Sequence, residues 1–172
     1  MLSTILAGYP WLAPAALAAL ALLSPPIGAL LVGRPRAAWT LAALAVLAVL
    51  VATLSPTGRE LEAGCVLVVE ARLTAPEPLA NVVLTVPLAL LVGVASRRPA
   101  LGAAVTIVLA LAIEAVQALV PALGRSCAAD DALANGVGAA VGALLAVAAL
   151  AIARRARPGA DRPADRRIRT PQ

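Results

Sequence analysis

The stretch at residues 99–153 reads PALGAAVTIVLALAIEAVQALVPALGRSCAADDALANGVGAAVGALLAVAALAIA. Its two apolar parts, 99–121 and 132–153, are each long enough to cross a hydrocarbon core of about 30 Å as a helix. The first part is interrupted by Glu114. A charge at the centre of such a helix costs roughly 2.5–3.5 kcal/mol on insertion scales. We therefore expect the polar groups of this stretch to be paired, solvated or functional.

The composition is that of an integral membrane protein. Hydrophobic residues make up 62% of the 172 residues, charged residues 13%, and the mean hydropathy is +0.94, whereas soluble domains carry about a quarter charged residues. The chain has room for one compact bundle but not for an additional soluble domain of ordinary size. Because it has no His and only one Met, we expect neither a bound metal nor a cofactor.

Three further charge-free stretches complete the predicted membrane crossings. They cover residues 11–32, 37–58 and 78–96, and Pro25 and Pro26 predict a kink or a break in the first. Five crossings place eleven of the 14 Arg on one side of the membrane and three on the other. By the positive-inside rule, the N-terminus is then outside and the C-terminus inside. The predicted fold class is an all-α, polytopic transmembrane helix bundle of about five helices.

The sequence divides into three parts by composition. Residues 1–36 hold the first helix and a basic cytoplasmic turn, and residues 37–153 form a four-helix transmembrane domain with an outer loop at 57–77. Residues 154–172 are a basic tail, which we expect to be disordered and to touch anionic lipid rather than nucleic acid. A signal peptide is the alternative for the first helix, but no basic residue precedes the apolar stretch.

The two cysteines of the chain are expected on the same, extracytoplasmic side. Cys65 lies in the loop before the third helix and Cys127 in the loop before the fifth. A disulfide between them would close a loop of about 60 residues, which the chain-entropy argument values at roughly 4 kcal/mol. The alternative is two unpaired, buried cysteines that pack as small apolar residues. The shared oxidising compartment favours the disulfide.

Polar side chains on the fourth and fifth helices fall on shared faces. Glu114 and Gln117 are three residues apart, and Asp131 and Asn135 are four apart, so each pair shares a helix face. Gly138 and Gly142 continue the second face and predict a close helix contact, for which the 99–121 helix is the nearest partner. The candidate ligand-binding residues, from three helices and one loop, are Asn81, Glu114, Gln117, Arg125, Asp130, Asp131 and Asn135.

These groups could instead satisfy one another without any ligand. Arg125 would pair with Asp130 or Asp131, one of these two acids would cap the fifth helix, and Gln117 would bond Asn135. Such interhelical bonds are common and modest, averaging about 0.6 kcal/mol in membrane proteins. Glu114 fits this alternative least well, because it lies about 10 Å inside the apolar stretch at 1.5 Å per residue.

The order of these residues resembles the VanZ-like family of bacterial membrane proteins. The resemblance rests on Glu114-x-x-Gln117, Arg125, Asp130-Asp131, Asn135 and the Gly138 to Gly142 pattern, with support from the Pro-centred helix that begins at Asn81. It covers about residues 37–155. It implies a multi-pass protein of the bacterial plasma membrane and envelope, in a family whose founding member is associated with resistance to the glycopeptide teicoplanin.

Binding is the function that these observations favour. We expect the extracytoplasmic polar pocket to bind a lipid-linked wall precursor or a lipoglycopeptide. One alternative is an intramembrane enzyme acting on a lipid-linked envelope substrate, but the lack of His and of a clear nucleophile disfavours it, and no catalytic residue is assigned. Another is a transporter or assembly subunit that forms a homo-oligomer through its glycines. Membrane lipids are the other expected partners.

Overall fold

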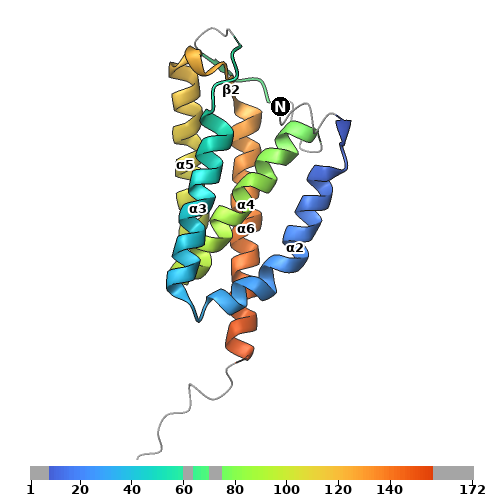
Figure 1. Cartoon of the computed structure of the whole chain (residues 1–172), viewed down its shortest axis with the longest axis vertical. Helices are drawn as coiled ribbons and strands as arrows, with labels where there is room; N and C mark the ends of the chain where they lie inside the picture. Colours follow the sequence, from blue (N-terminus) through green and yellow to red (C-terminus); the bar gives the residue numbers. More distant parts are fainter. Residues whose placement is uncertain (1–7, 60–63, 70–74, 157–172) are drawn as a thin grey trace, which may run out of the picture.

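Five long helices dominate the part of the chain that the structure describes (Figure 1). The computed structural model describes residues 8–59, 64–69 and 75–156. The helices are α2 (Leu12–Leu31), α3 (Pro35–Leu54), α4 (Pro76–Ser96), α5 (Pro99–Leu119) and α6 (Ala129–Arg155). Each is long and apolar enough to cross a membrane. The predicted fold class, an all-helical bundle with five spans, is confirmed.

Short elements lie in two of the connections between helices. A 3₁₀ turn, η1 (Pro121–Leu123), follows α5, and the two-residue strand β2 (Cys127–Ala128) leads into α6. Strand β1 (Cys65–Val66), in the connection between α3 and α4, pairs with β2 in parallel, with Cys65 opposite Cys127. The expected outer loop therefore contains a strand, although a very short one.

Proline marks the start of three helices, where its missing N–H is not needed and its fixed φ angle suits the helix. α3, α4 and α5 begin at Pro35, Pro76 and Pro99. α6 begins at Ala129, earlier than the predicted start at residue 132, because its first turn holds Asp130 and Asp131. Negative charge is favourable against the helix dipole at this position.

Two prolines lie inside α2 without ending it. The helix is continuous from Leu12 to Leu31 through Pro25 and Pro26, and it bends part-way along its length (Figure 1). A proline inside a helix removes a backbone hydrogen bond and crowds the preceding turn, which produces such a bend. Of the two predicted outcomes, the structure shows the kink.

Helix α4 occupies the centre of the bundle. It packs against α6, α5, α3 and α2, and it runs obliquely between α3 and α5 on one side and α2 on the other (Figure 1). Its side chains Val86, Leu88 and Ala89 are 0% exposed. Residues on all sides of α4 are therefore held by neighbouring helices.

The glycines of α6 pack against α4, with which α6 runs parallel. A Cβ added at Gly138 would meet the hydroxyl of Thr85, and one added at Gly142 would meet the carbonyl of Val86. The prediction of a close helix contact at these glycines is confirmed. The predicted partner was wrong, because α4 rather than α5 provides the facing surface.

Helix α5 approaches α4 through a different glycine. A Cβ at Gly102 would meet the carbonyl oxygen of Ala89 on α4. Nearness in sequence favoured α5 as the partner of α6, but the connection between them contains η1 and β2 and is not a tight turn. The most extensive packing is between α4 and α6, which are not consecutive in the sequence.

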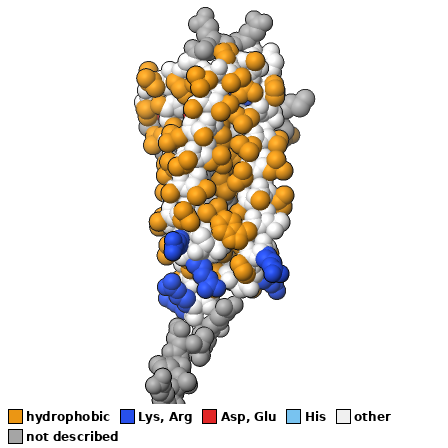
Figure 2. Space-filling model, turned by 90° about the vertical axis from the view of Figure 1, so that its left-hand side faces the viewer, with side chains coloured by type: hydrophobic (Ala, Val, Ile, Leu, Met, Phe, Trp, Pro, Cys, Tyr) orange, Lys and Arg blue, Asp and Glu red, His pale blue; other side chains and the backbone are white. Residues whose placement is uncertain are grey.

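The two ends of the bundle differ in charge. One end, here called the basic end, contains the α2–α3 turn, the α4–α5 turn and the end of α6, and arginines gather around it (Figure 2). These arginines are Arg34, Arg36, Arg97, Arg98, Arg154 and Arg155. The opposite end, here called the loop end, contains β1, β2 and η1. That the basic end faces the cytoplasm stays a prediction of the positive-inside rule.

Large apolar side chains cover the outside of the helices. Leu22 is 76% exposed, Leu144 69% and Val108 67%, and Figure 2 shows apolar side chains spread over the face of the bundle above the arginines. Apolar surface of this extent marks a membrane or partner interface. Together with the five spans, it indicates a multi-pass membrane protein.

Candidate functional site: a polar cavity at the loop end

A cavity of about 590 Å³ lies within the half of the bundle nearer the loop end. All five long helices contribute to its wall, together with the residues that follow α3 and η1. Its polar and charged lining residues are Thr53, Thr57, Arg59, Asn81, Thr85, Thr106, Glu114, Gln117, Arg125, Ser126, Asp131 and Asn135. The volume falls within the range of about 300–1,000 Å³ that is usual for small-molecule sites.

Glu114 and Gln117 lie on the cavity side of α5, and each is 8% exposed. The Glu114 carboxylate accepts a hydrogen bond from the backbone N–H of Ala128, with 3.1 Å between N and Oε2. Gln117 donates from Nε2 to the carbonyl oxygen of Thr53, at 2.9 Å. Both side chains thus connect α5 to backbone groups of other segments, β2 in one case and α3 in the other.

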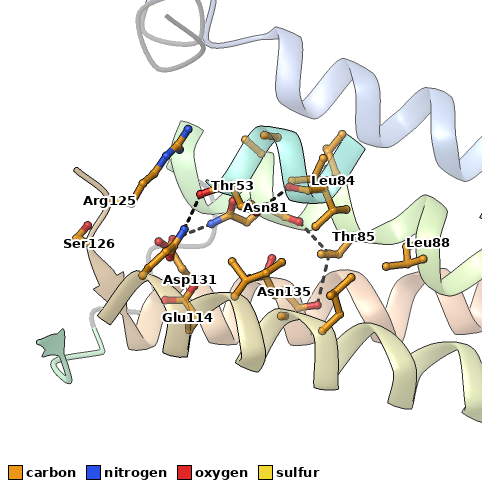
Figure 3. Close-up of a pocket in the computed structure, with 18 of the residues that line it drawn as sticks. Thr53, Asn81, Leu84, Thr85, Leu88, Glu114, Arg125, Ser126, Asp131 and Asn135 are labelled. Carbon is orange, nitrogen blue, oxygen red and sulfur yellow. Dashed lines mark hydrogen bonds between the residues drawn. The ribbon is translucent and has the colours of Figure 1, made fainter. Parts of the chain in front are cut away.

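Polar contacts between α4 and α6 form the next part of the wall (Figure 3). Asn81 donates from Nδ2 to Oδ1 of Asp131 at 2.8 Å. One helical turn further along, the hydroxyl of Thr85 lies 2.8 Å from the carbonyl oxygen of Asn81 and 3.4 Å from that of Asn135. The expected participation of Asn81 is therefore observed, in a contact between parallel helices.

The segment after α3 pairs with the segment after η1 at the loop end. Thr57 donates from its backbone N–H to the carbonyl of Leu123 at 3.0 Å and from its hydroxyl to that of Gly124 at 2.6 Å. Arg125 Nε donates to the carbonyl of Ser55 at 3.3 Å. We call this set of bonds the loop contact. It places residues from two distant connections along one side of the cavity.

A glycine is required within the loop contact. Gly124 has a φ of +61°, in the left-handed region, which side chains other than glycine rarely adopt. A Cβ there would also lie 2.5 Å from the Thr57 hydroxyl and 2.6 Å from the Arg59 carbonyl oxygen. Any larger residue would force the two segments apart.

The predicted disulfide is present. Cys65 and Cys127 are bonded, with their Cα atoms 4.6 Å apart, and they occupy paired positions in β1 and β2. Ala128 follows Cys127, so the disulfide lies one residue from the backbone N–H that donates a hydrogen bond to the Glu114 carboxylate. It therefore anchors the strand that satisfies the buried carboxylate.

The chain matches the family model VanZ/LLP1 over residues 39–152. This match covers more than half of the sequence. The chain belongs to the VanZ/LLP1 family. No curated protein and no solved structure matches the chain, so residue roles within the site come from its geometry alone.

The VanZ/LLP1 match covers most of the cavity wall but not all of it. It begins at Trp39 in α3 and ends at Ile152 in α6. Helix α2 precedes the match and yet supplies Leu12, Ala13 and Ala16 to the wall. Helix α2 of this family member is thus part of the cavity rather than a separate anchor.

Six of the seven candidate binding residues line the cavity: Asn81, Glu114, Gln117, Arg125, Asp131 and Asn135. Asp130 is half-buried in the first turn of α6 and is not among the lining residues. Two of the pairings given as the alternative differ in the structure: Gln117 bonds Thr53 rather than Asn135, and no side-chain hydrogen bond caps α6. Arg125 donates from Nε to the carbonyl of Ser55.

Sequence reasoning missed several lining residues, among them Thr53, Thr85, Ser126 and Arg59. Threonine in an apolar helix is a weak signal, because its hydroxyl can bond a carbonyl of its own helix, as that of Thr53 does with Val49. Arg59 had a usable signal. It is one of three Arg that the predicted topology places on the side of the membrane with few positive charges.

Proposed function

We propose that this VanZ/LLP1 protein binds a lipid-linked or lipopeptide ligand of the bacterial envelope in the cavity at the loop end. The observation that carries the proposal is a cavity with a polar, partly charged wall inside a bundle whose outer surface is apolar. A membrane protein that merely satisfied its own polar groups would not need this open volume. A ligand with both polar and hydrocarbon parts matches such a wall.

The lining residues would contact different groups of the ligand. Arg125 presents a guanidinium group that suits a phosphate or carboxylate. Glu114, Asp131 and Asn135 offer oxygen and amide groups to hydroxyl and amide groups of the ligand. Gln117 and Asn81 hold the helices in register through their bonds to Thr53 and Asp131.

The charge of the basic end supports an orientation for this site. With the arginines of the basic end in the cytoplasm, as the positive-inside rule requires, the cavity faces the extracytoplasmic side of the plasma membrane. Lipid-linked wall precursors and lipoglycopeptides are encountered on that side. A contribution to teicoplanin resistance belongs to this proposal and is tested separately below.

Retention of a ligand during purification tests the proposal. Full-length protein in a mild detergent should carry an amphiphile that native mass spectrometry detects, and Ala52→Trp, which fills the cavity from α3, should reduce its occupancy at least about tenfold. Ala48→Trp is the matched control, since Ala48 is exposed on the same helix and does not line the cavity. Equal occupancy in wild type and Ala52→Trp would contradict the proposal.

Resistance is tested in a host that expresses the protein at matched levels. We expect wild type to reduce susceptibility to a lipid-bearing glycopeptide more than to a lipid-free one. Glu114→Gln and Asp131→Asn should weaken this difference, because they change groups of the cavity wall. If all variants and the wild type behave like the empty host, the link to resistance is wrong, whereas binding of an envelope lipid would stand.

A further inference from the structure

We infer that the ligand is a lipid phosphate, held at its phosphate by Arg59 and Arg125, with one hydrocarbon chain in the inner part of the cavity. This assignment rests on the proposed function and narrows it to a class of ligand. It adds Arg59, an inner hydrocarbon site and a route of entry between α2 and α3.

The loop contact brings the two arginines to one side of the cavity. The backbone of Thr57 pairs with that of Leu123, and a Cβ at Gly124 would lie 2.6 Å and 2.8 Å from the backbone O and N of Arg59. Arg125 is the next residue along the chain, and both arginines line the cavity. Two arginines on one side of a cavity can supply guanidinium groups to the several oxygens of a phosphate, an arrangement that suits a phosphate better than a single carboxylate.

The acidic residues of the wall are engaged elsewhere. Glu114 accepts from the Ala128 N–H and Asp131 accepts from the Asn81 amide. The Arg125 side chain points away from Glu114 and Asp131 in Figure 3, and its Nε donates to a neutral carbonyl. We assign its terminal N–H groups to an anion at the edge of the cavity.

The inner part of the cavity is apolar. Leu84 and Leu88 of α4 face Leu109 and Ile113 of α5 there. The hydroxyls of Thr85 and Thr106 also line the cavity, but each bonds a carbonyl of its own helix, that of Asn81 at 2.8 Å and that of Gly102 at 2.9 Å. From Glu114 to Thr106 the wall extends about 12 Å along α5, at 1.5 Å per residue. This depth suits a section of one hydrocarbon chain.

The volume sets a limit on what the cavity encloses. About 590 Å³ is the size of a site for a drug-sized molecule, which is too small for a whole glycopeptide or a complete lipid-linked oligosaccharide. The phosphate and the adjoining hydrocarbon fit inside. The remainder of a larger ligand would extend beyond the loop end or into the bilayer.

The hydrocarbon chain would enter from the bilayer between α2 and α3, because both helices contribute lining residues to the cavity. These helices are joined by a short turn at the basic end and diverge toward the loop end (Figure 1). α2 packs mainly on α4 and α6 rather than on α3. Ala16 of α2 and Ala52 of α3 both line the cavity, so its wall includes the separated parts of both helices.

Isothermal titration of the full-length protein in mild detergent tests the phosphate contact, with dodecyl phosphate as the probe. Arg59→Ala and Arg125→Ala should each weaken its binding about tenfold. Binding of the neutral probe dodecyl glucoside should not change. Arg36→Ala, an exposed arginine at the basic end, is the matched control. Unchanged binding of dodecyl phosphate to both cavity variants would overturn the inference.

Entry of the hydrocarbon chain is tested by placing a bulky side chain on α2 where this helix lines the cavity. Ala16→Trp should weaken dodecyl phosphate about tenfold or more while leaving any binding of inorganic phosphate unchanged. Ala19→Trp, at an exposed position of the same helix, should have no effect. If inorganic phosphate binds as tightly as dodecyl phosphate to the wild type, the hydrocarbon part of the inference is wrong.

Two further comparisons identify the source of the phosphate and separate the two proposals. Vesicles containing a polyprenyl phosphate or a diacyl phosphatidate distinguish the two sources, and binding of either supports the assignment, whereas binding of neither overturns it. Equal affinity for dodecyl glucoside and dodecyl phosphate would refute the phosphate site and leave the proposed function standing. Failure to bind either probe, with no lipid retained after purification, would refute the proposed function itself.

Discussion

Single residues in this bundle are satisfied by backbone groups more than by one another. Glu114 illustrates this, because its carboxylate accepts from the Ala128 N–H rather than from an arginine. Gln117 likewise reaches a carbonyl on α3. A polar side chain inside a membrane-spanning bundle is costly until it has a partner, and any nearby unpaired backbone group can serve.

Replacement of Glu114 tests the importance of the acceptor oxygen. Glu114→Ala should lower the free energy of unfolding by about 1–3 kcal/mol, since it leaves the part-buried Ala128 N–H without its acceptor. Glu114→Gln keeps an oxygen at the same distance along the side chain and should lose less. Thermal unfolding in detergent micelles measures both. Equal losses would show that the charge, and not the acceptor, matters.

Gly138 offers a test with an internal control on the same helix. Gly138→Ala should destabilise the protein by about 1–3 kcal/mol, because the added Cβ would meet Thr85 on α4 and overpack the contact. Gly136→Ala adds a Cβ with nothing within 4 Å and should stabilise the helix by up to about 1 kcal/mol. Comparison of the two unfolding curves checks both signs, and destabilisation by Gly136→Ala would contradict the argument.

At the scale of elements, two short strands connect the loops to the helices. β1 and β2 have only two residues each and could not form a stable sheet alone. The Cys65–Cys127 disulfide holds them together, and β2 leads directly into α6. The covalent bond therefore sets where α6 begins relative to the rest of the loop end.

Removal of this disulfide should lower stability. It joins residues that are 62 apart in sequence, and the chain-entropy argument gives about 4 kcal/mol for a loop of that length. We expect Cys65→Ser/Cys127→Ser to unfold at a lower temperature than the wild type, and a reductant to lower the wild type to the same value. A further effect of reductant on the double variant would contradict this account.

At the scale of the whole molecule, the two ends of the bundle have different roles. The basic end gathers the arginines and the short turns, and the loop end holds the cavity. Arginine is retained on the cytoplasmic side during membrane insertion. In the proposed orientation, the charge that orients the protein is separated from the cavity proposed to bind the ligand.

Topology reporters test this orientation. A fluorescent protein fused after Gln172 should fluoresce in the cytoplasm, whereas alkaline phosphatase at the same position should stay inactive. Alkaline phosphatase inserted after Gly58, in the loop before β1, should be active. Replacement of Arg34, Arg36, Arg97 and Arg98 by Ala should weaken the preference for this orientation. These residues supply the positive charge of the two turns that are predicted to be cytoplasmic. Alkaline phosphatase activity of the C-terminal fusion would contradict the proposed orientation.

Much of the fold could be predicted from local features of the chain. The length of the apolar stretches specifies the five helices, since a crossing of the hydrocarbon core needs about 20 residues. Gly138 and Gly142 indicated a close helix contact, and the shared side of Cys65 and Cys127 indicated their bond. Each of these inferences depends on composition, spacing or side of the membrane alone.

Which helices pack together and which polar groups pair could be learned only from the tertiary structure. The glycines of α6 pack on α4 rather than α5, and Glu114 bonds the strand before α6. The backbone of Arg59 lies beside Gly124, and both Arg59 and Arg125 line the cavity. α2, which precedes the residues matched by the family model, forms part of the cavity wall. Within a membrane, helices are apolar on most sides, so hydrophobicity does not specify which faces meet; close packing of small residues and the pairing of a few polar groups do.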